Sequence, residues 1–256
     1  MIDTFYDDLA EHYHLIFENW ERSIARQATI LGPLLERVTG KSSPYVLDCA
    51  CGIGTQTLGL AQRGHRIVAS DLSRMAVERA MREAQQRQLA IPFHICDMRE
   101  LRSIPESGFD AVLAADNALP HLLSQADLEL ALVQIAEKLA PPGIFVATLR
   151  DYDKLIATRP TIQPPAFYSQ DDGERIVHQV WGWHGNEYDM HLYLTIPAEA
   201  GWTVKHFHSR YRALLRSDLN LALQASGLGH IEWLEPEDTS YYQPIIVARK
   251  SATSIE

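Results

Sequence analysis

The sequence predicts an α/β fold built on a doubly wound parallel sheet. In the first 150 residues, short and continuously apolar runs alternate with segments of helical periodicity. Such runs are typical of strands buried on both faces, and their alternation with helices favours parallel strands joined by right-handed crossovers. After residue 155 the segments become longer and β-rich, which predicts an antiparallel insertion in the same chain.

Composition limits the classes of partner. The chain has 256 residues and a formal net charge of −10, so it lacks a basic footprint for DNA or RNA. No apolar run approaches the ~18 residues of a membrane span, and the acidic start lacks the basic region of a signal peptide. Three cysteines are too few for a disulfide framework in a chain of this size. We therefore expect a cytoplasmic protein that binds no nucleic acid and no membrane; the sequence leaves open whether it is a monomer or a homo-oligomer.

The N-terminal residues predict a helical segment ahead of the first strand. Over residues 7–39, apolar side chains recur at steps of three and four residues, which places them on one face of a helix. Gly32 and Pro33 predict a local break in that helix. A parallel sheet does not require such a segment, so we expect residues 1–40 to form a helical lid over the site.

The next elements follow the alternation in order. A run after Ser42, Ser43 and Pro44 predicts the first strand, and Gly64 is a natural end for the helix before the second strand. The predicted strands are 45–50, 66–70, 93–96, 109–115 and 144–149, and the predicted helices are 55–63, 74–88 and 125–139.

The second half of the chain predicts the insertion and a return to the main sheet. Two β-rich segments, 175–183 and 188–196, flank a hairpin signal at Gly185, and a third strand is predicted at 203–215. Ser217 is the expected N-cap of a helix. The remaining expectations are a Pro-rich connection at 151–165, a helix at 217–226, strands at 231–234 and 244–248, a main domain of residues 41–154 and 213–250, and an antiparallel cap at 155–212.

A glycine-containing turn is the strongest local signal of chemistry. The motif DCACGIGT, from Asp48 to Thr55, ends the first strand and opens the next helix. Gly52 and Gly54 lack the Cβ atoms that would keep a ligand away from the backbone, and the helix start offers free N–H groups. Asp71 ends the second strand, where a carboxylate is placed to accept hydrogen bonds from ribose hydroxyls.

The nature of the nucleoside ligand follows from two departures from the dinucleotide pattern. A nicotinamide dinucleotide fingerprint requires a small residue where this chain has Thr57. Asp48 would face a pyrophosphate unfavourably, whereas it could hold water or bind an ammonium group. A cationic nucleoside without phosphate, S-adenosylmethionine, fits these residues better.

Four motifs together resemble class I S-adenosylmethionine-dependent methyltransferases. The turn from Asp48, the acidic Asp71, the CDM motif from Cys96 and the FDAV motif from Phe109 look like motifs I, post-I, II and IV of that family. The similarity spans about residues 44–150, and Ala50 stands where most members have glycine. The resemblance implies a Rossmann-like sheet, S-adenosylmethionine as the cofactor with S-adenosylhomocysteine as its product, and no metal.

Further motifs narrow the resemblance to one branch. The stretches ADNALPHL from Ala115, LRDYD from Leu149, FYDDLA from Phe5 and YHLIF from Tyr13 are similar to glycine and glycine/sarcosine N-methyltransferases. Some small-molecule N-methyltransferases that act on azapteridines of the toxoflavin type look similar. The resemblance therefore implies methyl transfer to a small molecule, with antibiotic biosynthesis as one setting.

The resemblance also implies roles for individual residues. Asp71 would bind the ribose diol, Asp97 the adenine amino group, and Arg26 the methionine carboxylate. His121 and Tyr6 are the candidates for moving an acceptor proton. The residues implied to bind the cofactor are Tyr13, Arg26, Ala50, Gly52, Asp71, Leu72, Asp97, Met98 and Ala115. Those expected to face the acceptor are Tyr6, Trp20, Asn117, Arg150, Trp181, Trp183 and Tyr241.

The acceptor and the reaction type remain open at this level. Because Asp151 and Asp153 lie close in sequence to Arg150, we expect them to neutralise it, which favours a planar nitrogen heterocycle over glycine or sarcosine. The alternatives are a glycine/sarcosine N-methyltransferase, an O-methyltransferase and a non-catalytic protein that binds S-adenosylmethionine. A nucleotide-dependent oxidoreductase is disfavoured by Thr57. Cys49 and Cys51 are expected to be buried small hydrophobes rather than metal ligands.

Overall fold

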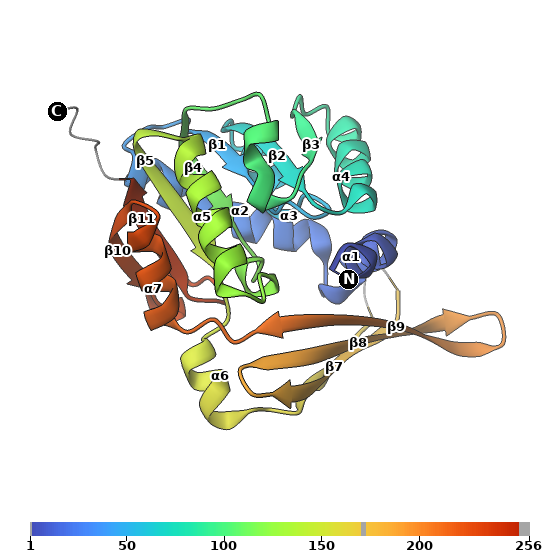
Figure 1. The fold of residues 1–256 in the computed structure, drawn as a ribbon. Coiled ribbons are helices and arrows are strands. Elements are labelled where there is room, and N and C mark those ends of the chain that lie inside the picture. The colour runs from blue at the N-terminus through green and yellow to red at the C-terminus, as the bar shows by residue number, and fades with distance from the viewer. Residues whose placement is uncertain (1, 170–172, 251–256) are drawn as a thin grey trace.

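A computed structural model describes residues 2–169 and 173–250, which form two sheets with helices packed around them (Figure 1). The helices are α1 Ile2–Leu9, α2 Trp20–Thr39, α3 Thr55–Gln62, α4 Arg74–Gln86, α5 Gln125–Lys138, α6 Tyr152–Thr158, α7 Arg216–Ala225 and α8 Pro236–Thr239, with 3₁₀ turns η1 Ala10–Ile16, η2 Met98–Ser103 and η3 Leu119–His121. The strands are β1 Tyr45–Asp48, β2 Arg66–Asp71, β3 Phe93–Ile95, β4 Phe109–Ala114, β5 Leu139–Thr148, β6 Ile162–Tyr168, β7 Arg175–His184, β8 Glu187–Ala198, β9 Gly201–Arg212, β10 Leu228–Leu234 and β11 Ile245–Lys250.

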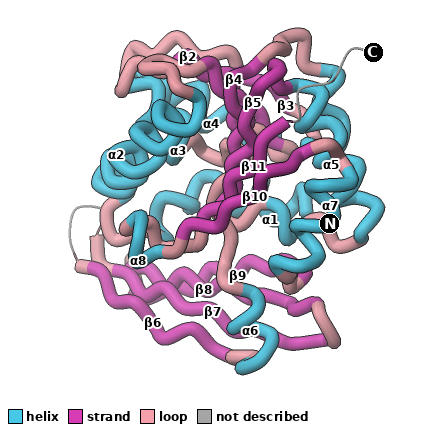
Figure 2. Tube along the Cα trace, turned by 90° about the vertical axis from the view of Figure 1, so that its left-hand side faces the viewer, coloured by secondary structure: helices cyan, strands magenta, loops and turns pink. Residues whose placement is uncertain are grey.

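The larger sheet has seven strands in the order β10-β11-β5-β4-β1-β2-β3. Strand β11 pairs antiparallel with both of its neighbours, and the other pairings are parallel. Figure 2 shows α2 and α3 on one side of this sheet and α5 and α7 on the other. Strand order reverses between β1 and β4, so their carboxyl ends form the crevice in which α/β sheets bind ligands. The predicted fold class is confirmed.

The sequence pattern explains why these strands lie at the centre. Val46, Leu47, Val112 and Val146 are each fully buried, because helices cover both faces of the sheet. Continuous apolar runs are stable only in that two-sided environment. Among the described residues, no helix is long and apolar enough to cross a membrane.

The N-terminal segment differs from the single broken helix expected over residues 7–39. Helix α1 passes into η1, and a new helix starts at Trp20, where the side chain of Asn19 accepts a hydrogen bond from the Arg22 amide at 2.8 Å. The expected break at Pro33 is wrong, since α2 continues through it to Thr39. Burial of one face of α2 against the sheet outweighs the hydrogen bond that proline removes.

Three expectations for the second half also require correction. Helix α6 lies inside the stretch expected as a Pro-rich connection, with Asp151 accepting from the Lys154 amide as its N-cap. Strand β6 follows despite two prolines, because it is an edge strand with a register shift, where a missing N–H is tolerated. Helix α7 begins at Arg216 after Leu215, so Ser217 is not its N-cap.

The smaller sheet is antiparallel, with the order β6-β7-β8-β9, and it faces the N-terminal segment. Helix α1 lies between α4 and β9 (Figure 1). The buried guanidinium of Arg175, at the start of β7, donates to the backbone carbonyls of Leu15, Phe17 and Glu18. The cap sheet and the N-terminal segment are therefore fastened to each other.

A close contact between α2 and α3 gives a testable stability difference. A Cβ atom on Gly59 would lie 2.7 Å from the Ile24 carbonyl oxygen and 2.8 Å from the Ala28 Cβ. Since these atoms belong to a packed helix, Gly59→Ala is expected to lower the free energy of unfolding by about 1–3 kcal/mol, measured by urea unfolding. Gly182→Ala is the control, because its Cβ would have no neighbour nearer than 3.8 Å. Equal stabilities of the two variants would contradict this packing.

Candidate functional site

The turn after β1 is built around a buried carboxylate. Asp48 is inaccessible to solvent, and its Oδ2 accepts a hydrogen bond from the Thr57 hydroxyl at 2.6 Å. Burial raises the pKa of Asp48 to about 7. Gly52 has φ +51° and Gly54 has φ +97°, both in the left-handed region that favours glycine. Asp48 therefore has a structural role: its buried carboxylate holds Thr57, in the first turn of α3, against the end of β1.

Asp71 joins this turn to the loop after β2. Its Oδ2 accepts from the Gly52 amide at 2.8 Å, and its Oδ1 accepts from the Ser73 amide at 2.9 Å. Burial raises the pKa of Asp71, while these two amides act in the opposite direction. Asp71 also lines a cavity at the end of β2, described below, where the ribose of a nucleoside is expected.

Asp97 lies at the same end of the sheet, but its carboxylate already has a partner. The Arg99 guanidinium donates to both Asp97 oxygens, with Nη2 2.6 Å from Oδ2, and it also pairs with Asp127 at 2.7 Å. Asp97 and Met98 line the cavity next to Asp71. If an adenine amino group donates a hydrogen bond to Asp97, the carboxylate would accept from it and from Arg99 at the same time.

Two adjoining cavities meet at the carboxyl ends of β1 and β4. The nucleoside cavity, of about 110 Å³, is lined by eight of the nine residues expected to bind the cofactor: Tyr13, Ala50, Gly52, Asp71, Leu72, Asp97, Met98 and Ala115. The ninth, Arg26, lines a second cavity of about 530 Å³, which we call the acceptor cavity. Tyr6, Tyr13 and Asp116 line both, so they mark the junction.

The predicted proton-moving pair lies at this junction. The Tyr6 hydroxyl and His121 Nε2 share a hydrogen bond of 2.7 Å, and His121 Nδ1 is 3.5 Å from the Ser209 hydroxyl. Burial, reinforced by the charge of Arg150, lowers the pKa of His121 to about 3. Burial also raises the pKa of Tyr6. At neutral pH both groups are uncharged, so His121 is a weak proton acceptor that orients the Tyr6 hydroxyl.

This depressed pKa predicts how acid affects stability. Between pH 6.5 and 5 the unfolded chain protonates His121, with an ordinary pKa of 6.5, but the folded chain does not. The unfolded state then binds more protons, so stability falls as pH falls, by about 1–2 kcal/mol over this window. Urea unfolding at pH 6.5 and 5 should show a smaller loss for His121→Gln than for the unmodified chain. Identical losses would show that His121 is not held neutral.

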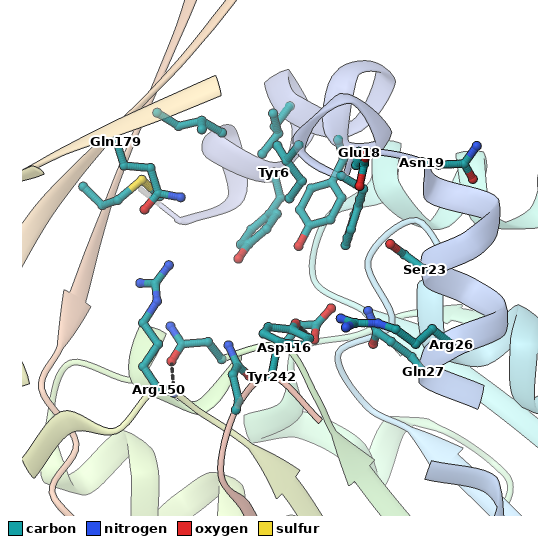
Figure 3. Close-up of a pocket in the computed structure, with 18 of the residues that line it drawn as sticks. Tyr6, Glu18, Asn19, Ser23, Arg26, Gln27, Asp116, Arg150, Gln179 and Tyr242 are labelled. Carbon is teal, nitrogen blue, oxygen red and sulfur yellow. Dashed lines mark hydrogen bonds between the residues drawn. The ribbon is translucent and has the colours of Figure 1, made fainter. Parts of the chain in front are cut away.

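Arg150 lies across the acceptor cavity from Arg26 (Figure 3), and Asn117 also lines this cavity. The Arg150 guanidinium donates to the Tyr188 hydroxyl at 2.7 Å and lies 4.8 Å from the ring centre of Trp181. Asn117 is 4% exposed; its Oδ1 accepts from the Arg150 amide and the Tyr152 hydroxyl, while its Nδ2 has no hydrogen-bond partner.

The expected neutralisation of Arg150 by its sequence neighbours is wrong. Asp151 pairs with Lys154 at 2.9 Å, and both Asp151 and Asp153 lie within 4 Å of Arg216. Throughout residues 2–169 and 173–250, no carboxylate forms an ion pair with Arg150. The acceptor cavity therefore presents a guanidinium whose charge is not cancelled.

Four aromatic residues expected to face the acceptor do not line either cavity. The Trp20 indole donates to the Thr55 hydroxyl at 2.9 Å and packs in the core between α2 and α3. Trp181, below the Arg150 guanidinium, stacks on Tyr188, and the Trp183 ring packs against Tyr188 at a tilt. Tyr241 is 1% exposed and donates to Asp116. These rings support the site from outside the cavity.

Other residues of the site were not predicted. Asp116 has its carboxylate at the junction, with Gln27 and Gln56 beside it. Tyr242 and Tyr211 line the acceptor cavity. Asp116 stands in the same sequence stretch as Asn117, so its position could have been noticed; the other four come from distant parts of the chain.

The seven-stranded sheet has one antiparallel strand and carries the nucleoside cavity at its switch point. Residues 46–143 match the model of the methyltransferase domain family. Glycine/sarcosine N-methyltransferase of Parasynechococcus marenigrum is 32% identical over 111 residues, covering 43% of this chain and 39% of that protein. The chain spans about two fifths of the length of the curated relatives it matches.

Two solved structures share the fold over almost the whole chain. Streptomyces venezuelae DesVI superposes with a TM-score of 0.78 at 22% identity, covering 94% of this chain and 98% of that one. The 1,6-didemethyltoxoflavin-N1-methyltransferase of Burkholderia thailandensis, solved with its acceptor and S-adenosylhomocysteine, has a TM-score of 0.55 at 18% identity, covering 98% and 87%. The predicted resemblance to methyltransferases of these kinds is confirmed.

Proposed function

We propose that this protein is an S-adenosylmethionine-dependent N-methyltransferase whose acceptor is a small amine with a carboxylate group. One observation carries the choice of acceptor. Arg150 and Asn117 both line the acceptor cavity, and the buried Nδ2 atom of Asn117 has no hydrogen-bond partner. A guanidinium and an amide N–H₂ are donors only, so the group that satisfies both is an anionic oxygen acceptor.

The nucleoside cavity supports S-adenosylmethionine as the methyl donor. Gly52 leaves open space where a Cβ atom would project, since no atom lies within 4 Å of that position. The Asp71 carboxylate faces the place of a ribose diol, and Leu72 and Met98 supply apolar surface for an adenine ring. The donor, when bound, supplies an activated methyl group on its sulfonium, so the chain needs to provide placement and not activation.

The residues of the junction have three tasks in such a reaction. Tyr6 and Tyr13 line both cavities, so their rings would help to exclude water from the place of transfer. The Tyr6 hydroxyl, held by His121, can accept a hydrogen bond from the acceptor nitrogen and orient its lone pair. Because neither group takes up a proton readily at neutral pH, the acceptor must enter as the free amine or release its proton to solvent.

A planar nitrogen heterocycle is the second candidate acceptor. The rings of Tyr6, Tyr13 and Tyr211 line the cavity and offer flat faces. The toxoflavin methyltransferase named above also shares the fold. The other argument for a heterocycle is a neutralised Arg150, and it does not hold because Asp151 and Asp153 lie beside Arg216 instead.

A methyl-transfer assay tests the proposal. The protein is incubated with S-adenosylmethionine and with glycine, sarcosine, larger amino acids, amines lacking a carboxylate, and pteridine-like heterocycles. Formation of N-methyl products from carboxylate-bearing amines supports it, whereas turnover of only the heterocycles favours the second candidate. O-methylated products would assign a different reaction, and binding of S-adenosylmethionine without turnover of any acceptor would indicate a binding protein.

If residues 1–40 act as a lid, ligand binding should protect their backbone amides from hydrogen exchange. Residues between Phe5 and Gln27 form much of the acceptor cavity wall. Ligands bound there would bridge the N-terminal segment to the sheet and suppress local opening. Hydrogen exchange of residues 5–27 is expected to slow when S-adenosylhomocysteine and an acceptor bind. Equal exchange with and without ligands would contradict the lid, and α5, on the far side of the sheet, is an internal control.

A further inference from the structure

Gln179 on β7 presents an amide to the acceptor cavity in one fixed orientation. Its Oε1 accepts a hydrogen bond from the Trp181 indole at 3.0 Å. An indole N–H can only donate, so the atom turned toward Trp181 is the oxygen, and the Nε2 group points away from the indole. Trp181 is 2% exposed, and a buried indole N–H is stable only with such a partner.

The Nε2 group of Gln179 is a hydrogen-bond donor that remains available to a ligand. In the part of the chain that the structure describes, no atom accepts a hydrogen bond from it. Gln179 pairs with Leu192 on β8, and Leu192 and Met190 line the cavity with apolar atoms. A donor in apolar surroundings discriminates strongly between ligands with and without an acceptor oxygen, because a ligand without one leaves the donor unpaired.

Trp181 holds Gln179 and Arg150 in a fixed relation. The Arg150 guanidinium lies 4.8 Å from the centre of the Trp181 ring, while the N–H at the edge of that ring bonds Gln179. The same ring stacks on Tyr188, with centroids 4.7 Å apart, and the Tyr188 hydroxyl accepts from Arg150. Figure 3 shows Gln179 and Arg150 together on one side of the cavity, across from Arg26. A molecule whose carboxylate is bound by Arg150 therefore has the Gln179 amide as a second donor on the same side.

The acceptor cavity has room for a molecule larger than glycine. Its volume of about 530 Å³ lies within the range of pockets that hold drug-sized molecules. When the carboxylate of an amino acid is at Arg150 and its amine is at the junction, its side chain has space toward β7 and β8. Of the residues on these two strands that line the cavity, Gln179 is polar, and Met190 and Leu192 are apolar. An oxygen on the side chain of the bound amino acid is the group that fits this donor.

We infer that Gln179 binds an oxygen on the side chain of the methyl acceptor, which is then an amino acid with a hydroxyl, carboxamide or carboxylate side chain. This inference rests on the proposed function, in which Arg150 receives the α-carboxylate. Gln179 is a specificity residue of the acceptor cavity. Trp181 is a positioning residue, because it orients the Gln179 amide without lining either cavity.

Methyl-transfer kinetics with matched acceptors test the role of Gln179. Asparagine with leucine, and threonine with valine, are pairs of similar shape in which only the first member has a side-chain oxygen. The unmodified chain is expected to favour the first member of each pair by about 10- to 100-fold in kcat/KM. Gln179→Met keeps the length of the side chain but removes the donor, so it should reduce this preference to less than about threefold. Gln163→Met is the control and should keep the preference, because Gln163 pairs with Gln179 from β6 but is exposed and does not line the cavity.

A second variant separates a donor from a structural role. Gln179→Glu retains an oxygen that accepts from Trp181 but presents another oxygen in place of the N–H₂ group, so it should lose the preference as fully as Gln179→Met. If Gln179→Glu keeps the preference, the inference is overturned. Equal use of both members of each pair by the unmodified chain also overturns it, whether or not the variants fold, and leaves the proposed function standing. Turnover of no carboxylate-bearing amine overturns the proposed function, and the inference with it.

Discussion

Replacing Arg150 with methionine is expected to lower kcat/KM for a carboxylate-bearing amine by about 30- to 1000-fold. A hydrogen-bonded charge pair inside a cavity contributes about 2–4 kcal/mol to substrate binding, and methionine keeps the length but not the charge of the side chain. The loss should appear mainly in KM, because the carboxylate is bound before and during transfer. Steady-state kinetics with saturating S-adenosylmethionine measure it.

Two comparisons make the Arg150 result specific. Toward the matching amine without a carboxylate, the Arg150→Met variant and the unmodified chain should react alike. Arg210→Met removes a guanidinium from an exposed position where it pairs with Asp189, so it should leave kcat/KM unchanged. An equal loss toward both amines would show that Arg150 supports the fold instead of the acceptor.

Replacing Asp71 with alanine is expected to weaken S-adenosylhomocysteine binding about 5- to 150-fold. Loss of hydrogen bonds to a ribose diol, with repacking of the loop, costs about 1–3 kcal/mol. The structure adds a reason, since the same carboxylate holds the amides of Gly52 and Ser73. Asp71→Asn, which keeps one acceptor oxygen, should have a smaller effect. Unchanged affinity by calorimetry for the alanine variant would remove Asp71 from the site.

The sheet and the nucleoside cavity were predictable because their signals are local. Gly52 and Gly54 come soon after a buried strand. Both have positive φ angles, which glycine adopts readily, so the residue type alone indicates a turn there. Asp71 and Asp97 end neighbouring strands, so parallel topology alone brings them to one edge of the sheet. The order of strands and helices in the first 150 residues is therefore enough to predict where these two carboxylates lie.

The acceptor cavity was not predictable in the same way, because its contacts are distant in sequence. Asp151 is next to Arg150 in the chain, yet it caps α6 and so points away from the guanidinium. Proximity in sequence therefore gave the wrong partner. The partners of Asp116 are separated from it by 60 to 126 residues, and no local pattern brings them together.

The hydrogen bond from Arg175 to Leu15 joins two parts of the chain 160 residues apart, and residues close to each, Glu18 and Gln179, line the acceptor cavity. Trimming the chain to begin after Glu18 would leave a buried guanidinium without three of its carbonyl acceptors, so the cap sheet would lose its anchor as well. Met190 and Leu192 line the cavity from β8 and take no part in that anchor, so substitutions there would change the shape of the cavity without removing the anchor.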